Sequence, residues 1–548
     1  MTILKVFLLF LFLVFLPSMA ASQEVLDYPI GASIDADEDV LGALTFDEQG
    51  ENVLYTVASL SGFEFDRVLR ASTLATGNSI RIAPNLPMRG IPPSTLANQP
   101  FTKGIIQLLD FLDSTTTISV APLNGDNAIQ LSQVVDQDFG SLVLFNNDGD
   151  QIFYNSRTDD ETGTGLFLQA INGLSQRVRL DTQNTNDTDS VTLEFAVTDN
   201  ESHAIFSTFS SKLFSRNLLN GNVNRIDADG IVSFLSNQFL ASRFAVSSNN
   251  SRVVYVADPA GGQSIPFGQY NLFSTDLNGA DRQQINPAGS LVTNFFISPD
   301  GASIIYRANQ NSSTFEIFIS PVEGGQSTRI SLPINQNTDE EIESFNLSGD
   351  GNLVTYSVFS QNGGYRRTFI INLLDSFRVV ELPGSNIQNF AINDSETQVA
   401  FVVGENFGFR SFTAYVGSLE TGSFSTFSIP GRFQGIDQIE FFDDDSLLFL
   451  GEDENFRSNL FAYSFENEEL LRLNREFTIV DPNSLAFGVE RYWQLRNSNR
   501  VVYLGDTNTT GRNELFGIDF SQIEFEPVAD EFCFPIVAGN GNTSVICL

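Results

Sequence analysis

The stretch NFFISPDGASIIYRANQNSSTFEIFISPVEGGQSTRISLP, from Asn294 to Pro333, carries the pattern that decides the fold. Tight turns are expected at Ser298-Pro299-Asp300-Gly301 and at Glu323-Gly324-Gly325, because these residue types favour turn dihedrals. The runs between the turns predict four short strands, at residues 295–297, 303–306, 316–320 and 328–331. Four antiparallel strands in this order make one blade of a β-propeller.

The same order of elements recurs at intervals of about fifty residues, which is typical of a repeat architecture. Each copy contains a β-rich run that follows a turn of Asp, Asn, Ser or Gly and ends in an aromatic residue. These aromatic residues are Tyr55, Tyr154, Phe206, Tyr255, Tyr306, Tyr356, Phe401, Phe449 and Tyr503. The double interval between the first two leaves room for one degenerate copy, so the sequence predicts about ten units.

Two further positions of the unit keep their chemistry from copy to copy. The first turn has short polar side chains that cap turn amides or accept left-handed dihedrals, at residues 47–50, 147–149, 199–200, 248–250, 348–351, 393–394, 443–445 and 497–499. The third strand has a Leu-Phe pair, at residues 166–167, 213–214, 272–273, 460–461 and 515–516. We expect these apolar pairs to fill the space between neighbouring blades.

The predicted fold class is therefore all-β, a β-propeller of about ten four-stranded blades in one large ring or two smaller rings. The repeats occupy residues 25–528. Proline cannot lie in the middle of a sheet, so the Pro-rich stretch 84–100 predicts a loop, and a domain subdivision near residues 84–140 is one option. Residues 529–548 stand apart from the repeats, either as a cap of the fold or as a tag for export or surface attachment.

The unit is similar to the PD40, or WD40-like, repeat of the TolB-type propellers. The matching residues are Ser298 to Gly301, Ile304-Ile305-Tyr306, Glu316-Ile317-Phe318, and Gly324-Gly325 before Arg329. Weaker copies cover most of the chain from about Leu41 to Val528. The α/β domain that precedes the TolB propeller has no counterpart here. The same repeats occur in propellers of prolyl-oligopeptidase-type peptidases and in oligogalacturonate lyases, so the resemblance implies a propeller fold and no particular activity.

The N-terminus reads as a secretory signal peptide over residues 1–20. Lys5 is followed by an apolar run from Val6 to Leu16, then by Pro17 and small residues suited to cleavage. We expect cleavage near Ala20, with Ser22 as the alternative. The run is too short to span a bilayer, which needs about 20 apolar residues, and no later segment approaches that length. The sequence thus predicts a periplasmic or secreted protein without a transmembrane anchor.

Both cysteines, Cys533 and Cys547, lie in the C-terminal segment. In an exported protein such a pair favours a disulfide, which would pin this segment, because the compartment is oxidising. Two buried free thiols are the alternative.

The formal net charge is −38, from 29 Lys plus Arg against 67 Asp plus Glu. A field of this sign repels phosphate backbones, so nucleic acid is excluded as a partner. The expected partners are an envelope or extracellular protein, or a glycan. Adaptation to a salty medium explains the acidic surface, and cation binding is the alternative.

Residues for Ser- or His-dependent catalysis are missing from the sequence. No Gly-x-Ser-x-Gly elbow is present, and His203 is the single histidine, in a run that predicts a blade strand. We therefore predict that the chain is not an enzyme and that it serves as a non-catalytic binding scaffold. Two alternatives remain open: a carboxylate-dependent enzyme acting on polysaccharide, and a surface structural protein or adhesin.

No cofactor is predicted, although calcium has weak candidates among the acidic turns. Hard cations prefer clustered carboxylates, and these occur at Asp35, Asp37 and Asp39 and at Asp443, Asp444 and Asp445. Neither group has the full EF-hand spacing, since Val40 and Phe46 stand where its Gly and Glu belong. Solvated acidic turns are the alternative interpretation.

Overall fold

The fold is taken from a computed structural model of the chain. It describes residues 28–29, 38–59, 66–76, 78–82, 94–98, 101–110, 115–135, 143–157, 163–172, 176–181, 191–208, 212–227, 231–232, 244–258, 271–310, 314–334, 339–404, 412–427, 429, 435–452, 457–474, 488–506, 513–520, 533–537 and 543–547. The chain divides into two compact units. The smaller unit has residues 1–32, 389–418 and 425–548, and the larger unit has residues 33–388 and 419–424. The subdivision considered near residues 84–140 lies inside the larger unit and stays a prediction.

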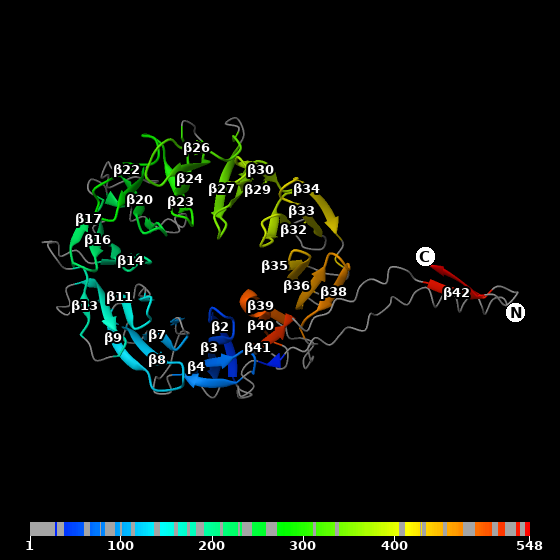
Figure 1. The fold of residues 1–548 in the computed structure, drawn as a ribbon, viewed down its shortest axis with the longest axis horizontal. Helices are drawn as coiled ribbons and strands as arrows, with labels where there is room; N and C mark the ends of the chain where they lie inside the picture. The colour runs from blue at the N-terminus through cyan, green and yellow to red at the C-terminus, as the bar shows by residue number, and fades with distance from the viewer. Residues whose placement is uncertain are drawn as a thin grey trace. The chain divides into compact units, whose positions relative to one another are not determined.

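The larger unit contains seven antiparallel sheets; six have four strands paired in chain order, and one has five, of which the first two both pair with the third. Their strands are β2 (Glu38–Phe46), β3 (Asn52–Ser59), β4 (Asp66–Thr73), β5 (Ser79–Ile82); β6 (Ser94–Ala97), β7 (Lys103–Asp110), β8 (Thr115–Pro122), β9 (Ile129–Val135); β10 (Val143–Phe145), β11 (Gln151–Arg157), β12 (Thr164–Ala170), β13 (Val178–Arg179); β14 (Val191–Val197), β15 (His203–Thr208), β16 (Leu213–Asn217), β17 (Val223–Arg225); β18 (Ile231–Val232), β19 (Phe244–Val246), β20 (Arg252–Asp258), β21 (Asn271–Asp276), β22 (Gln283–Gln284); β23 (Val292–Ile297), β24 (Ser303–Ala308), β25 (Glu316–Pro321), β26 (Thr328–Arg329); and β27 (Glu340–Leu347), β28 (Leu353–Ser360), β29 (Tyr365–Asn372), β30 (Arg378–Glu381). Within this unit the sheets follow one another along the chain, with first strands such as β14 and β23 on the inner side and fourth strands such as β17 and β26 on the outer side (Figure 1).

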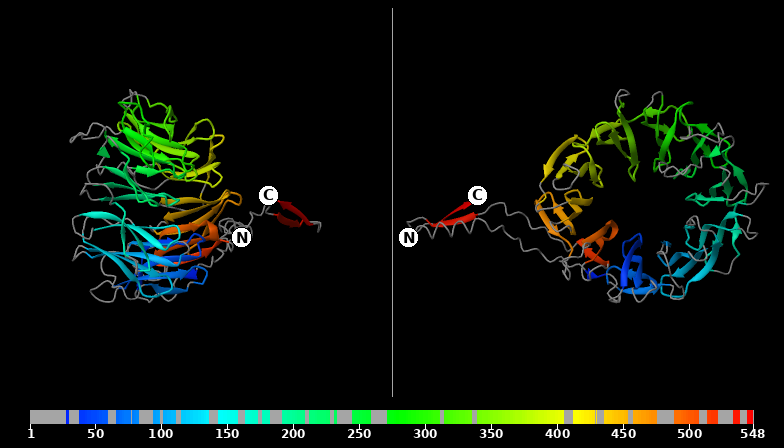
Figure 2. Two further views of the ribbon diagram at one scale, coloured as in Figure 1. Left: turned by 60° about the vertical axis from the view of Figure 1, so that its left-hand side comes forward. Right: turned by 180° about the vertical axis from the view of Figure 1, so that it is seen from behind.

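Three more blades lie mainly in the smaller unit, followed by a C-terminal hairpin. Their strands are β31 (Ile387–Ile392), β32 (Gln398–Gly404), β33 (Phe412–Ser418), β34 (Ser423–Phe427); β35 (Gly435–Asp443), β36 (Ser446–Glu452), β37 (Ser458–Ser464), β38 (Glu469–Arg472); β39 (Gly488–Leu495), β40 (Arg500–Asp506), β41 (Glu514–Asp519) with β1 (Tyr28–Pro29); and the hairpin β42 (Cys533–Val537) and β43 (Thr543–Cys547). A short 3₁₀ helix, η1 (Arg496–Ser498), joins β39 to β40. Two further views show the same succession of sheets within each unit (Figure 2). The prediction of an all-β fold built from about ten four-stranded propeller blades is confirmed.

The last blade takes its fourth strand from the N-terminal end of the chain. Strand β1 pairs with β41 antiparallel, with Tyr28 opposite Gly517 and Pro29 opposite Phe516. Proline is compatible with this place because an edge strand has one side without ladder hydrogen bonds. The sequence analysis missed this strand. A two-residue segment is too short to show strand alternation, so no sequence signal marks it.

The predicted aromatic residues occupy equivalent buried positions on the second strands, each at most 2% exposed. In eight blades the aromatic residue stands directly opposite an aromatic residue of the third strand, and the two rings stack with centroids 4.8–5.9 Å apart. The pairs are Tyr154–Phe167, Phe206–Phe214, Tyr255–Phe273, Tyr306–Phe318, Tyr356–Phe369, Phe401–Tyr415, Phe449–Phe461 and Tyr503–Phe516. Offset stacking of this kind adds about 0.5–1.5 kcal/mol per pair to the burial of the rings.

The polar side chains in the turns between first and second strands cap backbone amides, as the sequence predicts. In eight of these turns, or corners, a side-chain oxygen accepts a hydrogen bond from the amide five residues later, and in six of them also from the amide four residues later, which fixes the turn. Asn146 Oδ1 accepts from the amides of Asp150 and Gln151 at 3.0 and 2.8 Å. Asn393 Oδ1 does the same for Thr397 and Gln398 at 2.9 and 2.8 Å.

Corners of successive blades within the larger unit also bind one another. The amide of Asp199 donates to Asn250 Oδ1 at 2.8 Å, and Asn147 Nδ2 donates to the carbonyl of Asp199 at 2.6 Å. A further hydrogen bond joins Asn249 Nδ2 to the carbonyl of Gly301 at 3.3 Å. The polar turns therefore tie neighbouring blades together in addition to shaping each hairpin.

Candidate active site

The acidic residues chosen as calcium candidates do not form a described metal site. Asp35 and Asp37 lie outside the described residues, and Asp39 lies on β2, where only its backbone is described. Asp443 Oδ1 accepts from the amide of Asp445 at 2.9 Å and from the Ser446 hydroxyl at 2.6 Å, while Asp444 accepts from Asn393 Nδ2 at 2.5 Å. These carboxylates accept hydrogen bonds that fix their own corner and connect it to the neighbouring corner. No group of three or more potential metal ligands occurs in the described part of the chain.

His203 is a buried blade residue with both ring nitrogens in hydrogen-bonding contact. Its side chain lies at the start of β15, with Nδ1 2.9 Å from Ser202 Oγ and Nε2 3.2 Å from Asn217 Nδ2. Burial lowers the pKa of the imidazole, which therefore stays neutral to lower pH than a free histidine. It has no metal-ligand group around it among the described residues.

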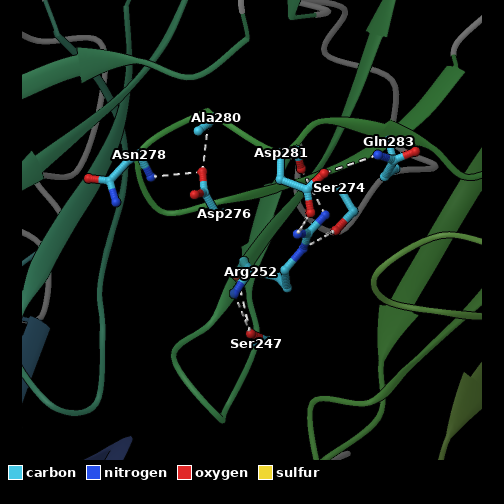
Figure 3. A network of polar contacts seen from close by, with 8 residues as sticks. All are labelled: Ser247, Arg252, Ser274, Asp276, Asn278, Ala280, Asp281 and Gln283. Atoms are coloured by element: carbon cyan, nitrogen blue, oxygen red, sulfur yellow. Dashed lines mark hydrogen bonds and ion pairs between the residues drawn. The ribbon is translucent and has the colours of Figure 1, made fainter.

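The next blade has a buried arginine at the same register position (Figure 3). Arg252, only 5% exposed, donates from Nε to Ser274 Oγ and from Nη1 to Asp281 Oδ2, both at 3.0 Å. Hydrogen bonds from Gln283 and then from Arg252 lower the pKa of the Asp281 carboxyl. Because Arg252 spans the second and third strands and the following loop, its contacts stabilise the blade.

The carboxyl group whose environment favours acid catalysis is that of Glu440, on β35 in the smaller unit. Its side chain is half-buried, and this burial raises the pKa of the carboxyl group. A hydrogen bond of 3.4 Å from Gln438 Nε2 to Oε1 partly opposes that rise. A carboxyl group that stays protonated to higher pH than a free one is better suited to general acid catalysis.

The backbone next to Glu440 is strained. Gln438 has φ of +46°, a left-handed conformation that is uncommon for a residue with a side chain. It is also the extra residue of a β-bulge, since Asp437 pairs with Leu450 and Ile439 with Phe449. Bulges and strained residues occur often beside functional sites, where they re-aim side chains.

Tyr492 and Gln494 of β39 bond to the part of β35 that carries Glu440, within the same unit. Gln438 Nε2 donates to the carbonyl of Tyr492 at 2.9 Å, and the Tyr492 hydroxyl donates to the carbonyl of Gln438 at 3.1 Å. Burial, together with the nearby charge of Glu440, raises the pKa of Tyr492 well above its usual value. Gln494 Nε2 donates to the carbonyl of Phe442 at 3.2 Å. We call Glu440, Gln438, Tyr492 and Gln494 the β35–β39 site.

Sequence reasoning did not select any member of this site. Glu440 is one of 67 acidic residues, and no spacing motif distinguishes it. The distinguishing features are its burial and the bulge, and both depend on pairing with other strands.

The backbones of the two C-terminal cysteines stand at paired positions of one hairpin. Strands β42 and β43 form a hairpin in which Cys533 stands directly opposite Cys547. Residues 521–532 and 538–542, which flank and connect these strands, lie outside the described residues.

The similar solved structures are propeller proteins of low sequence identity. Oligogalacturonate lyase from Vibrio parahaemolyticus is 10% identical, with 78% of this chain and 96% of that chain covered and a TM-score of 0.35. The β-propeller domain of the trilobed protease from Pyrococcus furiosus is 11% identical, with 61% and 93% covered and a TM-score of 0.30. Dipeptidyl peptidase 4 from Porphyromonas gingivalis is 8% identical, with 75% and 64% covered and a TM-score of 0.42. No family model and no curated protein matches the chain.

Several of these propeller-containing proteins are enzymes by name. This finding corrects both the prediction of a non-catalytic binding scaffold and the prediction that the chain is not an enzyme. Those predictions followed from a missing Gly-x-Ser-x-Gly elbow and a single histidine, which exclude only Ser- and His-dependent chemistry. A carboxyl group such as that of Glu440 can act as an acid or a base without a nucleophilic serine or a histidine.

Proposed function

We propose that the chain is a carboxylate-dependent enzyme acting on polysaccharide, with Glu440 as the proton donor. The observation that carries this proposal is a half-buried carboxyl group with a raised pKa, beside the strained Gln438 bulge. Cleavage of a glycosidic bond needs a carboxylic acid that protonates the leaving oxygen. Glu440 meets that need, because burial keeps its carboxyl group protonated to higher pH.

The composition supports a glycan substrate over the alternatives. A single histidine, already in contact with Ser202 and Asn217, leaves carboxyl groups as the main acid–base residues. The net charge of −38 opposes polyanionic substrates and favours a neutral polysaccharide. The substrates used to test this proposal therefore include both neutral and acidic polysaccharides.

Export belongs to the same proposal, because an extracellular or periplasmic enzyme would meet polysaccharide there. The signal peptide predicted over residues 1–20 supports export. No helix in the described part of the chain is long and apolar enough to cross a membrane.

We also propose that Cys533 and Cys547 form a disulfide that pins the C-terminal segment as a cap. Directly opposed residues of an antiparallel pair have Cα atoms about 4.5–5.5 Å apart, within the range that a disulfide bridges. Two thiols lose two electrons and two protons to an oxidising thiol–disulfide catalyst of the compartment. The exported protein should yield a cross-linked C-terminal peptide in non-reducing mass spectrometry. Free thiols at both positions would reject the bridge.

The enzyme proposal is tested by turnover on a panel of neutral and acidic polysaccharides. The wild-type protein should release new reducing ends from at least one neutral polysaccharide, and Glu440→Gln should lower kcat by about a hundredfold or more. The matched control is Glu420→Gln at an exposed turn, which should keep full activity.

The stability of Glu440→Gln separates lost chemistry from lost folding. Because the pKa of Glu440 is raised in the folded state, folding disfavours its ionised form above the unfolded pKa, and this penalty is absent in the glutamine variant. Glu440→Gln should therefore be at least as stable as the wild type at pH 7. No turnover on any polysaccharide, or full activity of Glu440→Gln, would show that the proposed function is wrong.

A further inference from the structure

The single histidine of the chain bridges two polar loops at one end of the blade of β14 to β17. Nδ1 of His203 lies 2.9 Å from the hydroxyl oxygen of Ser202, in the corner between β14 and β15. Nε2 lies 3.2 Å from Nδ2 of Asn217, the last residue of β16 before the turn to β17. The backbone joins the same two loops, because the amide of Leu218 donates to the carbonyl of Ser202 at 2.8 Å.

The turn after β16 fixes which atom of Asn217 faces the ring. Asn217 Oδ1 accepts from the amides of Leu219 and Asn220, both at 3.0 Å. With the oxygen held in this way, the Nδ2 donor faces His203. A donor needs an acceptor, so Nε2 carries no proton, and Nδ1 donates the one proton of the neutral ring to Ser202 Oγ. The two contacts therefore select one tautomer of the neutral imidazole.

A second proton on the ring conflicts with these partners. The imidazolium form has a donor at both nitrogens, so its Nε2–H group would meet the Nδ2–H group of Asn217. A rotation of the Asn217 amide would supply an acceptor, but it would take Oδ1 away from the two turn amides. The ring is only 8% exposed, so water offers little compensation. Protonation of His203 therefore costs either its contact with the turn or the hydrogen bonds that fix the turn.

The charged groups of the same blade do not offset the charge of an imidazolium. Burial alone lowers the pKa of His203, with no contribution from a neighbouring charge. Both arginines of the blade are engaged elsewhere: Arg216 donates to the carbonyl of Leu180 at 2.8 Å, and Arg225 pairs with Asp227. The charged side chains of the corner and of these four strands are Asp199, Glu201, Glu194, Arg216 and Arg225.

The next blade has a charged pair at the equivalent positions. His203 stands opposite Asn217 in the ladder of β15 and β16, and Arg252 stands opposite Asp276 in the ladder of β20 and β21. Asp276 fixes its turn as Asn217 does, because its Oδ1 accepts from two turn amides at 3.2 and 2.7 Å (Figure 3). A guanidinium group stays protonated at every pH that proteins meet. The turn after β21 is therefore a natural control for any effect of protonating His203.

We propose that His203 is an acid-sensitive latch, which holds the turn 218–222 to the corner 198–202 while its ring is neutral and releases the turn when the ring is protonated. The corner also binds the corners of both neighbouring blades, through Asn147 and Asn250. Release therefore loosens a point at which three blades are tied together. This inference goes beyond the proposed function and does not depend on it.

The direction of the pH effect on stability follows from linkage. The pKa of His203 is lowered in the folded state, so the unfolded chain takes up the proton first as the pH falls below about 6.5. The stabilisation that the latch provides is complete above that pH. It is lost as the pH falls from there to the pKa of the folded state.

The first test is an NMR titration, which reports on His203 alone because the chain has no other histidine. Protein without a histidine tag is labelled with ¹³C and ¹⁵N in histidine and titrated from about pH 8 to about pH 4.5. We expect a neutral ring with the proton on Nδ1, and a pKa below that of a free histidine. Asn217→Asp keeps the shape of the side chain but offers an acceptor to Nε2–H, so it should raise the proton affinity of the ring at least about tenfold. A neutral ring with the proton on Nε2, or equal pKa values in the two proteins, would overturn the proposal.

The second test is hydrogen exchange followed by mass spectrometry, which reports on release of the turn. After correction for the intrinsic effect of pH, residues 213–222 should exchange about tenfold faster or more at about pH 5 than at about pH 7.5, whereas residues 272–280 of the next blade should not change. Asn217→Asp should keep the turn protected at the lower pH. His203→Gln has an acceptor and a donor, as the neutral ring has, and should abolish the acid effect. The latch is rejected by equal behaviour of the two turns, or by an acid effect that persists in His203→Gln.

Discussion

Tyr306→Ala is expected to lower the free energy of unfolding by about 3–5 kcal/mol, the cost of truncating a fully buried aromatic residue. Tyr306 is 0% exposed and stacks on Phe318 with the ring centroids 5.8 Å apart. It packs with Val254, Val256 and Leu272 of the preceding blade, so its removal opens a cavity between two sheets. Its hydroxyl also donates to Ser327 Oγ at 2.6 Å and accepts from Gln310.

Urea denaturation followed by circular dichroism measures the change for Tyr306→Ala. Tyr306→Phe keeps the ring and removes only the hydroxyl, so its loss should be near 1 kcal/mol. Leu374→Ala is the surface control, because Leu374 is 77% exposed, and its change should be within about 0.5 kcal/mol. A loss below about 1 kcal/mol for Tyr306→Ala would contradict the view that these aromatic positions hold blades together.

Gly351→Ala is expected to destabilise the larger unit by about 2–6 kcal/mol through two separate effects. Gly351 has φ of +81°, and a residue with a side chain costs about 1–3 kcal/mol in that region. A Cβ atom there would also lie 2.3 Å from Cδ of Pro299 in the corner of the preceding blade. The two corners would have to separate, which adds an overpacking cost of about 1–3 kcal/mol.

The matched control for this prediction lies two residues earlier in the same corner. Gly349 does not have a positive φ, and a Cβ atom there would have no neighbour within 4 Å. Gly349→Ala should therefore leave the urea midpoint within experimental error or raise it slightly. Equal effects of the two substitutions would mean that the approach of Gly351 to Pro299 does not matter for stability.

Much of the fold could be predicted because its signals are local. Turn residues such as Ser298 and Asn393 cap amides four or five residues away, and the aromatic residues mark second strands that begin directly after these turns. The strands predicted between Asn294 and Pro333 match β23 to β26 within a few residues at each end. Each of these features depends on residues in one hairpin.

The candidate site was not predictable in the same way. The acidic turn at Asp443–Asp445 attracted attention because three carboxyl groups adjoin in sequence, yet they bind their own corner and its neighbour. Glu440 stands out only through the bulge and its surroundings on β39, more than fifty residues away in the chain. Burial and register decide its chemistry, and neither is visible in a spacing pattern.

By itself the sequence determined the four-stranded unit, its repetition about ten times and the polar and aromatic positions that build it, because these follow from turn chemistry and strand periodicity over a few residues. Only the tertiary structure decided that β1 completes the last blade and that the bulged part of β35 next to Glu440 bonds to Tyr492 and Gln494 of β39. Both depend on which distant segments pair and in which register, and that choice is made by packing across the whole unit.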